Sequence, residues 1–329
     1  MNRLSMRDVD WIGDYQALTE DAGLVDLGHR TQIELRGADR ATFLHNLCTQ
    51  EIRKLTIGAG CETFLTSVQG KTLAHVFVFG TPESLVLETV AREAEKILKH
   101  LDHYLVCEQV TLTDRSDQWS ELYLGGPHSE RVLDKLTGTR LSEARLAHAA
   151  ATLGGRPVWL RRADLAGRVG FLVNARSDDV EAVRAALCEA GAVACGAEAF
   201  EAARIEWGFP LFGRDITDKN FPQEVARDSL AISFVKGCYL GQETVARIDA
   251  LGHVNRTLAG LRFLGATIPP TGLEIRVADQ TIGQVTSTAY SPRLGAPLAL
   301  GYVRRGSNAP GTRLTSDLGD AEVIPLPVR

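Results

Sequence analysis

The chain has 329 residues, of which 44% are hydrophobic and 23% are charged, so it holds enough apolar material for packed cores and lacks the composition of a disordered chain. At roughly 100–200 residues per domain, this length predicts two or three domains and excludes a single small binding module. Lys and Arg number 36 against 41 Asp and Glu, a net charge of −5, so no global positive field attracts nucleic acid.

The first third of the chain predicts an α+β unit. Alternating or β-rich runs indicate strands, and apolar residues at helical spacing indicate one helix among them. In chain order the unit has a strand, a hairpin of two strands, another strand, a helix and a last strand, over residues 31–35, 62–67, 72–79, 84–90, 91–103 and 105–112. A similar order returns with strands over 157–160 and 169–173, followed by Ser177 as an N-cap and a helix to about Ala190. This order is compatible with two related α+β units, although no residues match between the two copies.

The sequence pattern changes after about Asn255, where expected short strands alternate with Gly and Pro turns. The expected strands cover 258–263, 273–277, 281–288, 297–303 and 312–314. From Leu251 onward there are 8 Lys and Arg against 5 Asp and Glu, which is +3 and leaves −8 on the preceding residues. We expect a body over residues 1–250 and a small antiparallel barrel over 255–329.

The six cysteines form no C-x-x-C pair or other metal signature, so neither a disulfide framework nor a metal site is expected. Residues 1–13 contain no apolar run typical of a secretory signal, and no uninterrupted apolar stretch approaches 18 residues. We therefore expect a cytoplasmic protein without membrane contact. The P-loop, dinucleotide and serine-hydrolase motifs are absent, and His100 and His103, three apart on a helix, lack a third metal ligand nearby.

The most unusual stretch runs from residue 204 to residue 249, and it contains Cys238. Gly237 and Gly241 flank this cysteine, and a short helix is expected from Gln242 onward. A helix N-terminus and the nearby Lys236 would both favour the thiolate. We interpret Cys238 as a functional thiol, against the alternative of an inert buried cysteine, and assign the other five cysteines to packing.

Glu206 lies in the same stretch, two residues after Arg204 and next to Trp207. A carboxylate there can accept two parallel N–H bonds from a planar ligand edge. The alternative is a salt bridge at a helix end, and the local pattern alone favours that alternative.

These motifs resemble a known family. The run Lys236-Gly237-Cys238-Tyr239-Leu240-Gly241-Gln242-Glu243 resembles the K-G-C-Y-x-G-Q-E signature of the YgfZ-type folate-binding proteins, a branch of the glycine-cleavage T-protein (aminomethyltransferase) superfamily. Residues 43–51, 100–104, 283–287 and 300–303 resemble further elements of that superfamily, with Glu51 in place of an Asp.

The resemblance implies a fold, a cofactor and site residues. The fold would be a ring-like α+β arrangement of two ferredoxin-like subdomains plus a small C-terminal antiparallel β-barrel, around a site for tetrahydrofolate or a one-carbon derivative. Arg204-Ile205-Glu206-Trp207-Gly208 resembles the superfamily's R-x-E-x-G, which makes Glu206 the candidate pterin contact, with Arg204 beside it. The signature would supply Cys238 as the reactive thiol and Lys236 as its neighbour, with Gly237, Tyr239, Gly241, Gln242 and Glu243 completing the motif.

One departure from the superfamily decides the functional prediction. Its aminomethyltransferases read roughly G-G-x-x-D-D in the hairpin, whereas this chain has Ala74 and His75 at the acidic pair. Without that carboxylate, aminomethyl transfer is disfavoured. We therefore expect a tetrahydrofolate-binding accessory protein in iron–sulfur cluster assembly or repair, with iron–sulfur client proteins, including tRNA-modifying enzymes, as partners.

Two alternatives stay open. The first is a folate-dependent one-carbon (aminomethyl or methyl) transferase that acts on a small amine. The second is direct binding of tRNA through the +3 C-terminal segment with Arg304, Arg305 and Arg313, although adjacent arginines are more often a solvated turn, so nucleic-acid binding is not expected.

Overall fold

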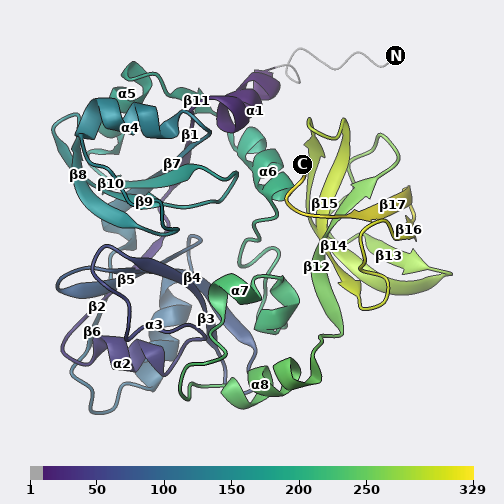
Figure 1. Ribbon diagram of the computed structural model, residues 1–329, viewed down its shortest axis with the longest axis horizontal. Helices are drawn as coiled ribbons and strands as arrows, with labels where there is room; N and C mark the ends of the chain where they lie inside the picture. The colour runs from purple at the N-terminus through teal and green to yellow at the C-terminus, as the bar shows by residue number, and fades with distance from the viewer. Residues whose placement is uncertain (1–9) are drawn as a thin grey trace.

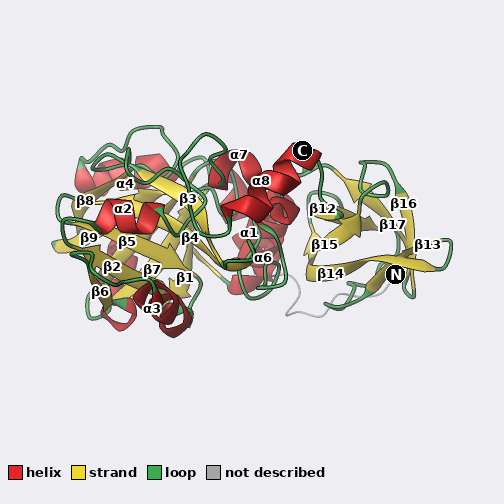
Figure 2. Cartoon of the chain, turned by 90° about the horizontal axis from the view of Figure 1, so that it is seen from below, coloured by secondary structure: helices red, strands yellow, loops and turns green. Residues whose placement is uncertain are grey.

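The computed structural model describes residues 10–329, and the start of the segment expected to lack a secretory signal, residues 1–9, lies outside the described residues. Two α+β units are stacked on one side of the molecule and a barrel lies on the other (Figure 1). Helices fill the space between the units and the barrel (Figure 2). This arrangement and the closed barrel confirm the predicted fold class.

The first unit is an antiparallel five-stranded sheet in the order β3-β4-β5-β2-β6. Its strands are β2 (Thr31–Arg36), β3 (Gly60–Thr66), β4 (Thr72–Gly80), β5 (Ser84–Thr89) and β6 (Thr111–Asp114). Helices α2 (Arg40–His45) and α3 (Ala94–His103) cover one face, where alternate strand residues such as Val76 and Val78 pack against Leu44 and Leu101. The other face carries His75, Phe77 and Phe79 toward the second unit, because successive strand residues point to opposite sides.

The second unit is a six-stranded sheet in the order β11-β1-β7-β10-β9-β8, in which only the β1–β11 pair is parallel. Its strands are β1 (Gly23–Gly28), β7 (Trp119–Gly125), β8 (His148–Leu153), β9 (Arg156–Arg162), β10 (Gly170–Arg176) and β11 (Val193–Cys195). Helices α4 (Ser129–Thr137) and α5 (Val180–Glu189) pack on its outer face. Tyr123 and Leu172 on the inner face join Phe77 and Phe79 in one core, so the inner faces of the two sheets meet.

Within residues 10–329, four helices lie between the sheets and the barrel. They are α1 (Asp10–Glu20), α6 (Ala197–Trp207), α7 (Asp228–Ala231) and α8 (Gln242–Leu251), together with a 3₁₀ turn at Pro222–Val225. A second 3₁₀ turn, Ser116–Gln118, joins β6 to β7. Helix α6 ends at Gly208, whose φ of +81° is a conformation that glycine adopts without strain. The chain can therefore leave α6 and return across the edge of the first sheet.

The C-terminal unit is a closed six-stranded antiparallel barrel in the order β12-β15-β14-β13-β16-β17. Its strands are β12 (Arg256–Phe263), β13 (Glu274–Val277), β14 (Gln280–Ser291), β15 (Ala296–Arg304), β16 (Arg313–Ser316) and β17 (Gly319–Ile324). Leu261, Val285 and Val303 are among the residues that fill its interior. The last strand, β17, carries polar residues at alternate positions and was not predicted from the sequence.

Two local predictions are wrong. The β-rich run over 105–112 forms a strand only from Thr111, because the preceding residues turn at the end of α3, where backbone N–H groups of Val106 and Cys107 donate to the Glu108 carboxylate. Ser177 does not cap α5: its hydroxyl donates to the Asp117 carbonyl, and the helix begins after Asp179.

Among residues 10–329, no helix is long and apolar enough to cross a membrane. The same part of the chain holds no cluster of three or more His, Cys, Asp or Glu side chains arranged for a metal ion. All six cysteines are free thiols.

Candidate functional site

The segment Lys236–Glu243 is held against the first sheet by backbone contacts. The Leu240 N–H donates to the Asn46 carbonyl over 2.8 Å, and the Thr66 hydroxyl donates to the Leu240 carbonyl over 2.6 Å. Gly241 has a φ of +80°, and a Cβ there would come within 2.3 Å of the Ser67 carbonyl oxygen. The segment thus requires glycine at 241 to pack against the hairpin that joins β3 and β4.

Cys238 and Lys236 lie in different surroundings within that segment. Cys238 is exposed and precedes α8, as the sequence predicted. The Lys236 ammonium is buried and donates to the carbonyls of His45, Cys48 and Gln50 over 2.6–2.9 Å. Its donors are therefore used to fix the loop after α2, and the described residues show no bond between them and the Cys238 thiol.

The other signature residues have mixed surroundings. The Tyr239 ring is buried and packs in one cluster with residues such as Phe64 and Phe212. Gly237 and Glu243 are exposed, and Gln242 is half-buried at the start of α8. The buried half of the signature therefore anchors the segment, and the exposed half surrounds Cys238.

Glu206 lies on α6 and is only 4% exposed. Its Oε2 accepts a 2.6 Å hydrogen bond from the Tyr15 hydroxyl, and its Oε1 accepts from the Ser291 hydroxyl and, more weakly, from the Arg293 N–H. A carboxylate offers about four acceptor positions, so three protein donors leave little capacity for a further ligand without movement of one of them.

Arg204 is fully buried one turn before the end of α6. Its guanidinium donates to the carbonyl of Phe209, to the Asp215 carboxylate and to the Ser287 hydroxyl. These bonds tie α6 to the following loop and to β14. Arg204 thereby positions Phe209, whose ring lies 5.9 Å from that of His75.

A second group of charged side chains lies beside the hairpin of β3 and β4, and it was not predicted from the sequence. Glu62 on β3 is fully buried, and its carboxylate accepts from the guanidinium groups of Arg227 and Arg145 and lies 2.6 Å from His75 Nε2. The His75 ring stacks on Phe64 at a centroid distance of 5.0 Å. Four side chains from four separate segments thus meet at one point on the inner face of the first sheet.

The protonation of this group follows from its contacts. Burial alone would raise the pKa of Glu62, but Arg227 and His75 hold that pKa well below its usual range, so the carboxylate is ionised. Burial lowers the pKa of His75 below 6.5, so its ring is neutral at pH 7. An ionised carboxylate only accepts hydrogen bonds, so Nε2 of His75 must carry the proton. Nδ1 then presents a lone pair.

A narrow cleft adjoins His75. It is lined by Arg30, Phe77, Thr89 and Phe209, among others, and encloses about 10 Å³, roughly the room of one water molecule. Neither Glu206 nor Cys238 lines this cleft. The two residues also share no hydrogen-bonding partner among residues 10–329, since Glu206 contacts α1 and β14 whereas the segment of Cys238 contacts the hairpin and the loop after α2.

Sequence reasoning missed Glu62, Arg145 and Arg227. Glu62 carries one usable signal, because it is a charged residue in the run 61–65, which is otherwise β-prone and lies in the interior. Arg145 and Arg227 lie in loops, where no periodicity marks them. Only the fold brings them to Glu62.

Two family models match the chain. The GCVT N-terminal domain matches residues 6–233, and the glycine cleavage T-protein C-terminal barrel domain matches residues 256–328. The signature segment at 236–243 lies between the two matches.

Curated relatives match over almost the whole chain. An aminomethyltransferase of Thermus thermophilus is 30% identical over 346 aligned residues, which cover 98% of this chain and 97% of the relative. An aminomethyltransferase of Streptomyces avermitilis is 29% identical over 307 residues, which cover 91% of this chain and 82% of the relative. The crystal structure of the glycine cleavage system aminomethyltransferase T from Bartonella henselae has the same fold, with a TM-score of 0.86, 21% identity, and coverage of 96% of this chain and 89% of that one.

These matches correct the functional prediction. The expectation of an accessory protein for iron–sulfur enzymes is wrong, because the relatives that cover nearly the whole chain are named aminomethyltransferases. That expectation relied on the loss of a carboxylate at Ala74 and His75. The structure supplies a carboxylate from the neighbouring strand, where Glu62 contacts His75. The alternative of a one-carbon transferase is the better supported reading.

Proposed function

The chain belongs to the glycine cleavage T-protein family, and on this premise we propose that it is a folate-dependent transferase that moves an aminomethyl or methyl group from a small amine. The observation that carries the proposal is the match to aminomethyltransferases along the whole chain, the barrel included. Within that family, we propose that the Lys236–Glu243 motif places the chain in the YgfZ-type branch, and that residues 1–250 and 255–329 act as a folate-binding body and a barrel domain.

Tetrahydrofolate is the one-carbon carrier of the family's aminomethyltransferases, as the sequence predicted for this chain. The residues present suit a pterin chemically. Glu206 is a buried carboxylate that can accept N–H bonds from a pterin edge once one of its present donors releases its bond. When bound, the folate would accept the one-carbon unit.

His75 is the group that we propose to handle the proton. Its Nε2–H donates to Glu62, which orients the ring and stabilises its charged form once Nδ1 takes up a proton. Arg145 and Arg227 hold Glu62 in place. The two phenylalanines beside His75 leave room for only about one water molecule next to the ring. In this way a His–Glu pair takes over the position of the acidic pair of the family.

Glu206 stays the proposed pterin contact, with Arg204 as a positioning residue that fixes the loop bearing Phe209. A two-point contact between Glu206 and a ring edge requires the Tyr15 hydroxyl or the Arg293 N–H to release its bond. Calorimetry with tetrahydrofolate on Glu206→Ala should show a clear loss of affinity. Unchanged binding would remove Glu206 from the site.

Cys238 stays the proposed working thiol, and its exposure makes it accessible to a thioether or disulfide partner. The matched control is Cys107→Ser, because Cys107 is also an exposed free thiol. Cys238→Ser should reduce turnover and Cys107→Ser should not. Equal activity of the two variants would assign Cys238 no part in the reaction.

The direct test is redox-neutral aminomethyl transfer. An aminomethyl thioether and tetrahydrofolate should give methylene-tetrahydrofolate, the free thiol and ammonia, with no net oxidation. Ammonia release that requires both tetrahydrofolate and the protein supports the proposal. A complete lack of turnover with aminomethyl and N-methyl donors, in a preparation that binds tetrahydrofolate, would overturn it.

A further inference from the structure

Two residues with left-handed backbone adjoin the two arginines that contact Glu62. Ala226 directly precedes Arg227, and Leu146 directly follows Arg145. Among residues 10–329, the residues other than glycine with a positive φ are Arg92, Leu146, Ala226, Ala278 and Asp279. The last two form the two-residue turn between β13 and β14, a place where positive φ is common. The backbone feature at the two arginines has no such explanation in a hairpin.

The conformation of Ala226 is strained. Its φ is +60° and its ψ is +37°, at the end of the 3₁₀ turn Pro222–Val225, where glycine is the usual residue. In this region the Cβ of any other residue comes too close to the following carbonyl oxygen. Ala226 is exposed, so burial of its own side chain does not offset this cost. Such strain persists only where the surrounding contacts fix the backbone, and it is concentrated at functional sites.

The surrounding contacts at Ala226 are charged side chains on both sides. Two positions before it, the Glu224 carboxylate accepts from the Asn220 amide and from the Arg256 guanidinium of β12, each over 3.2 Å. One position after it, Arg227 donates to both oxygens of Glu62. The left-handed residue therefore changes the direction of the chain between two anchored side chains.

The loop of Arg145 has the same feature. The Ala147 N–H donates to the Ala144 carbonyl over 3.1 Å, which makes Arg145 and Leu146 the central residues of a turn. Leu146 has a φ of +59° at the position of the turn that favours Gly or Asn when φ is positive. Unlike Ala226, it is only 1% exposed and packs in the core. Packing thus gives a second reason for leucine there, whereas Ala226 has none of this kind.

The position of the two arginines controls His75 through Glu62. The Glu62 carboxylate lies 2.6 Å from His75 Nε2. Among the charged groups that face His75, Glu62 raises its pKa, whereas Arg227 and Arg145 lower it. Moving Arg227 away would leave Glu62 less restrained and would raise the pKa of His75.

We propose that Ala226 is a positioning residue for the His75–Glu62 pair: its left-handed backbone directs the Arg227 side chain to Glu62 and so fixes the orientation of the His75 ring. The inference rests on the proposed role of His75 in the transferase reaction. The state of His75 can nevertheless be measured without turnover, so the two proposals can fail separately.

The pKa of His75, measured by NMR on histidine-labelled protein and assigned with His75→Phe, tests the proposal. Ala226→Val disfavours a positive φ and Ala226→Pro forbids it, so Arg227 should leave Glu62 and the pKa of His75 should rise. Turnover should fall by about tenfold. Ala226→Val is expected to fold, because position 226 is exposed.

Two variants separate the backbone from the side chain and from general strain. Ala226→Gly keeps the left-handed backbone, so the pKa of His75 and the turnover should stay at the wild-type values, with unfolding at the same or a slightly higher temperature. Ala278→Val places valine at another exposed alanine with a positive φ, in the barrel hairpin. It should lower the unfolding temperature without changing the pKa of His75.

The outcomes are distinct. A wild-type pKa of His75 in Ala226→Val or Ala226→Pro, with the protein folded by circular dichroism, would overturn the proposal. An equal rise in Ala226→Gly or in Ala278→Val would also overturn it, because the first keeps the backbone conformation and the second leaves Arg227 untouched. If the pKa changes follow the prediction but the wild type shows no turnover, Ala226 keeps its positioning role and the transferase proposal fails.

Discussion

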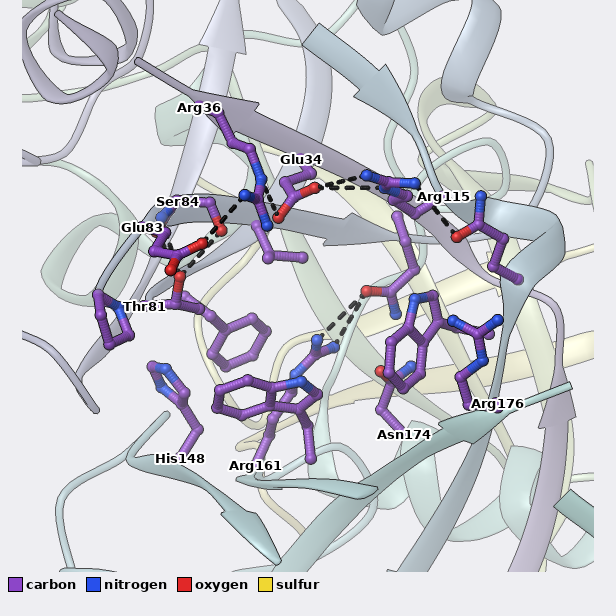
Figure 3. Close-up of a pocket in the computed structure, with 17 residues that line it drawn as sticks. Glu34, Arg36, Thr81, Glu83, Ser84, Arg115, His148, Arg161, Asn174 and Arg176 are labelled. Atoms are coloured by element: carbon purple, nitrogen blue, oxygen red, sulfur yellow. Dashed lines mark hydrogen bonds and ion pairs between the residues drawn. The ribbon is translucent and has the colours of Figure 1, made fainter. Parts of the chain in front are cut away.

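The hairpin cluster around Glu62 and the inter-sheet cavity around Arg161 use the same kinds of side chain on the same pair of facing sheets. At the hairpin, the Glu62 carboxylate is bonded by two guanidinium groups and one imidazole, and the cleft encloses only about 10 Å³. The cavity between the two sheets (Figure 3) encloses about 560 Å³ and is lined by Arg161, which lies 3.7 Å from the carboxyl groups of Glu88 and Glu121 and keeps a buried Nε without a partner.

The difference lies in how the charged side chains are used. At the hairpin, the charges satisfy one another and fix a reactive group, so that His75 offers a single oriented lone pair. At the cavity, the charged side chains border an open volume and leave one buried N–H without a partner. The three predictions below each alter one side of this comparison.

The largest effect is expected for His75→Phe. The phenyl ring keeps the stacking on Phe64 but has no nitrogen, so turnover should fall by about 10²–10⁴-fold, the range for a general base. In the wild type, kcat/KM should be level at neutral pH and should fall only below pH 6.5, because burial lowers the pKa of His75 and the neutral ring is the active form. The exposed His253→Phe is the control. A wild-type profile whose acidic limb lies above pH 6.5 would contradict the role of His75.

Glu62→Gln should cause the next largest effect, a loss of about 3–5 kcal/mol in the free energy of unfolding measured with urea. The amide would leave the buried guanidinium of Arg227 without its anion, whereas the part-exposed Arg145 would keep Asp164. Glu83→Gln removes an exposed partner of Arg36 and should change stability by less than about 1 kcal/mol. If the two variants were equally stable, the hairpin cluster would not be a tightly coupled charge group.

The amount that the sequence could predict differs between the parts of the molecule. The hairpin, the strand at β5, the start of α8 and five of the six barrel strands follow from local alternation, spacing and turn residues, which act over a few residues. The Lys236–Glu243 motif was recognisable because it is contiguous.

The two side-chain groups were not predictable in the same way. Arg227 reaches Glu62 across 165 positions of sequence, and Arg161 reaches Gln32 across 129, so no local pattern records either contact. The sequence also suggested that Lys236 acts on Cys238 because they are two positions apart. In the fold, the ammonium binds three carbonyls of the loop after α2 instead. Neighbours in sequence are therefore a weaker guide to electrostatics than neighbours across a sheet.

The smallest change in the free energy of unfolding is expected for Glu121→Gln, at a buried residue next to Arg161. Burial and the adjacent Glu88 raise the pKa of Glu121 to about 8, so its carboxyl stays protonated in the folded protein while the unfolded chain ionises near pH 4.5. The unfolded state therefore releases its proton first, and the free energy of unfolding of the wild type falls between about pH 4.5 and pH 8.

Glutamine cannot ionise, so Glu121→Gln should match the wild type at about pH 4 and exceed its stability by about 1–3 kcal/mol at about pH 8, as measured by urea unfolding. Glu83→Gln, which changes an exposed carboxylate, should show no such growth with pH. A constant difference between Glu121→Gln and the wild type across that interval would mean that the carboxyl ionises normally. Glu88 and Glu121 would then both be ionised and would fully neutralise Arg161. The charges at the cavity would satisfy one another, as those around Glu62 do.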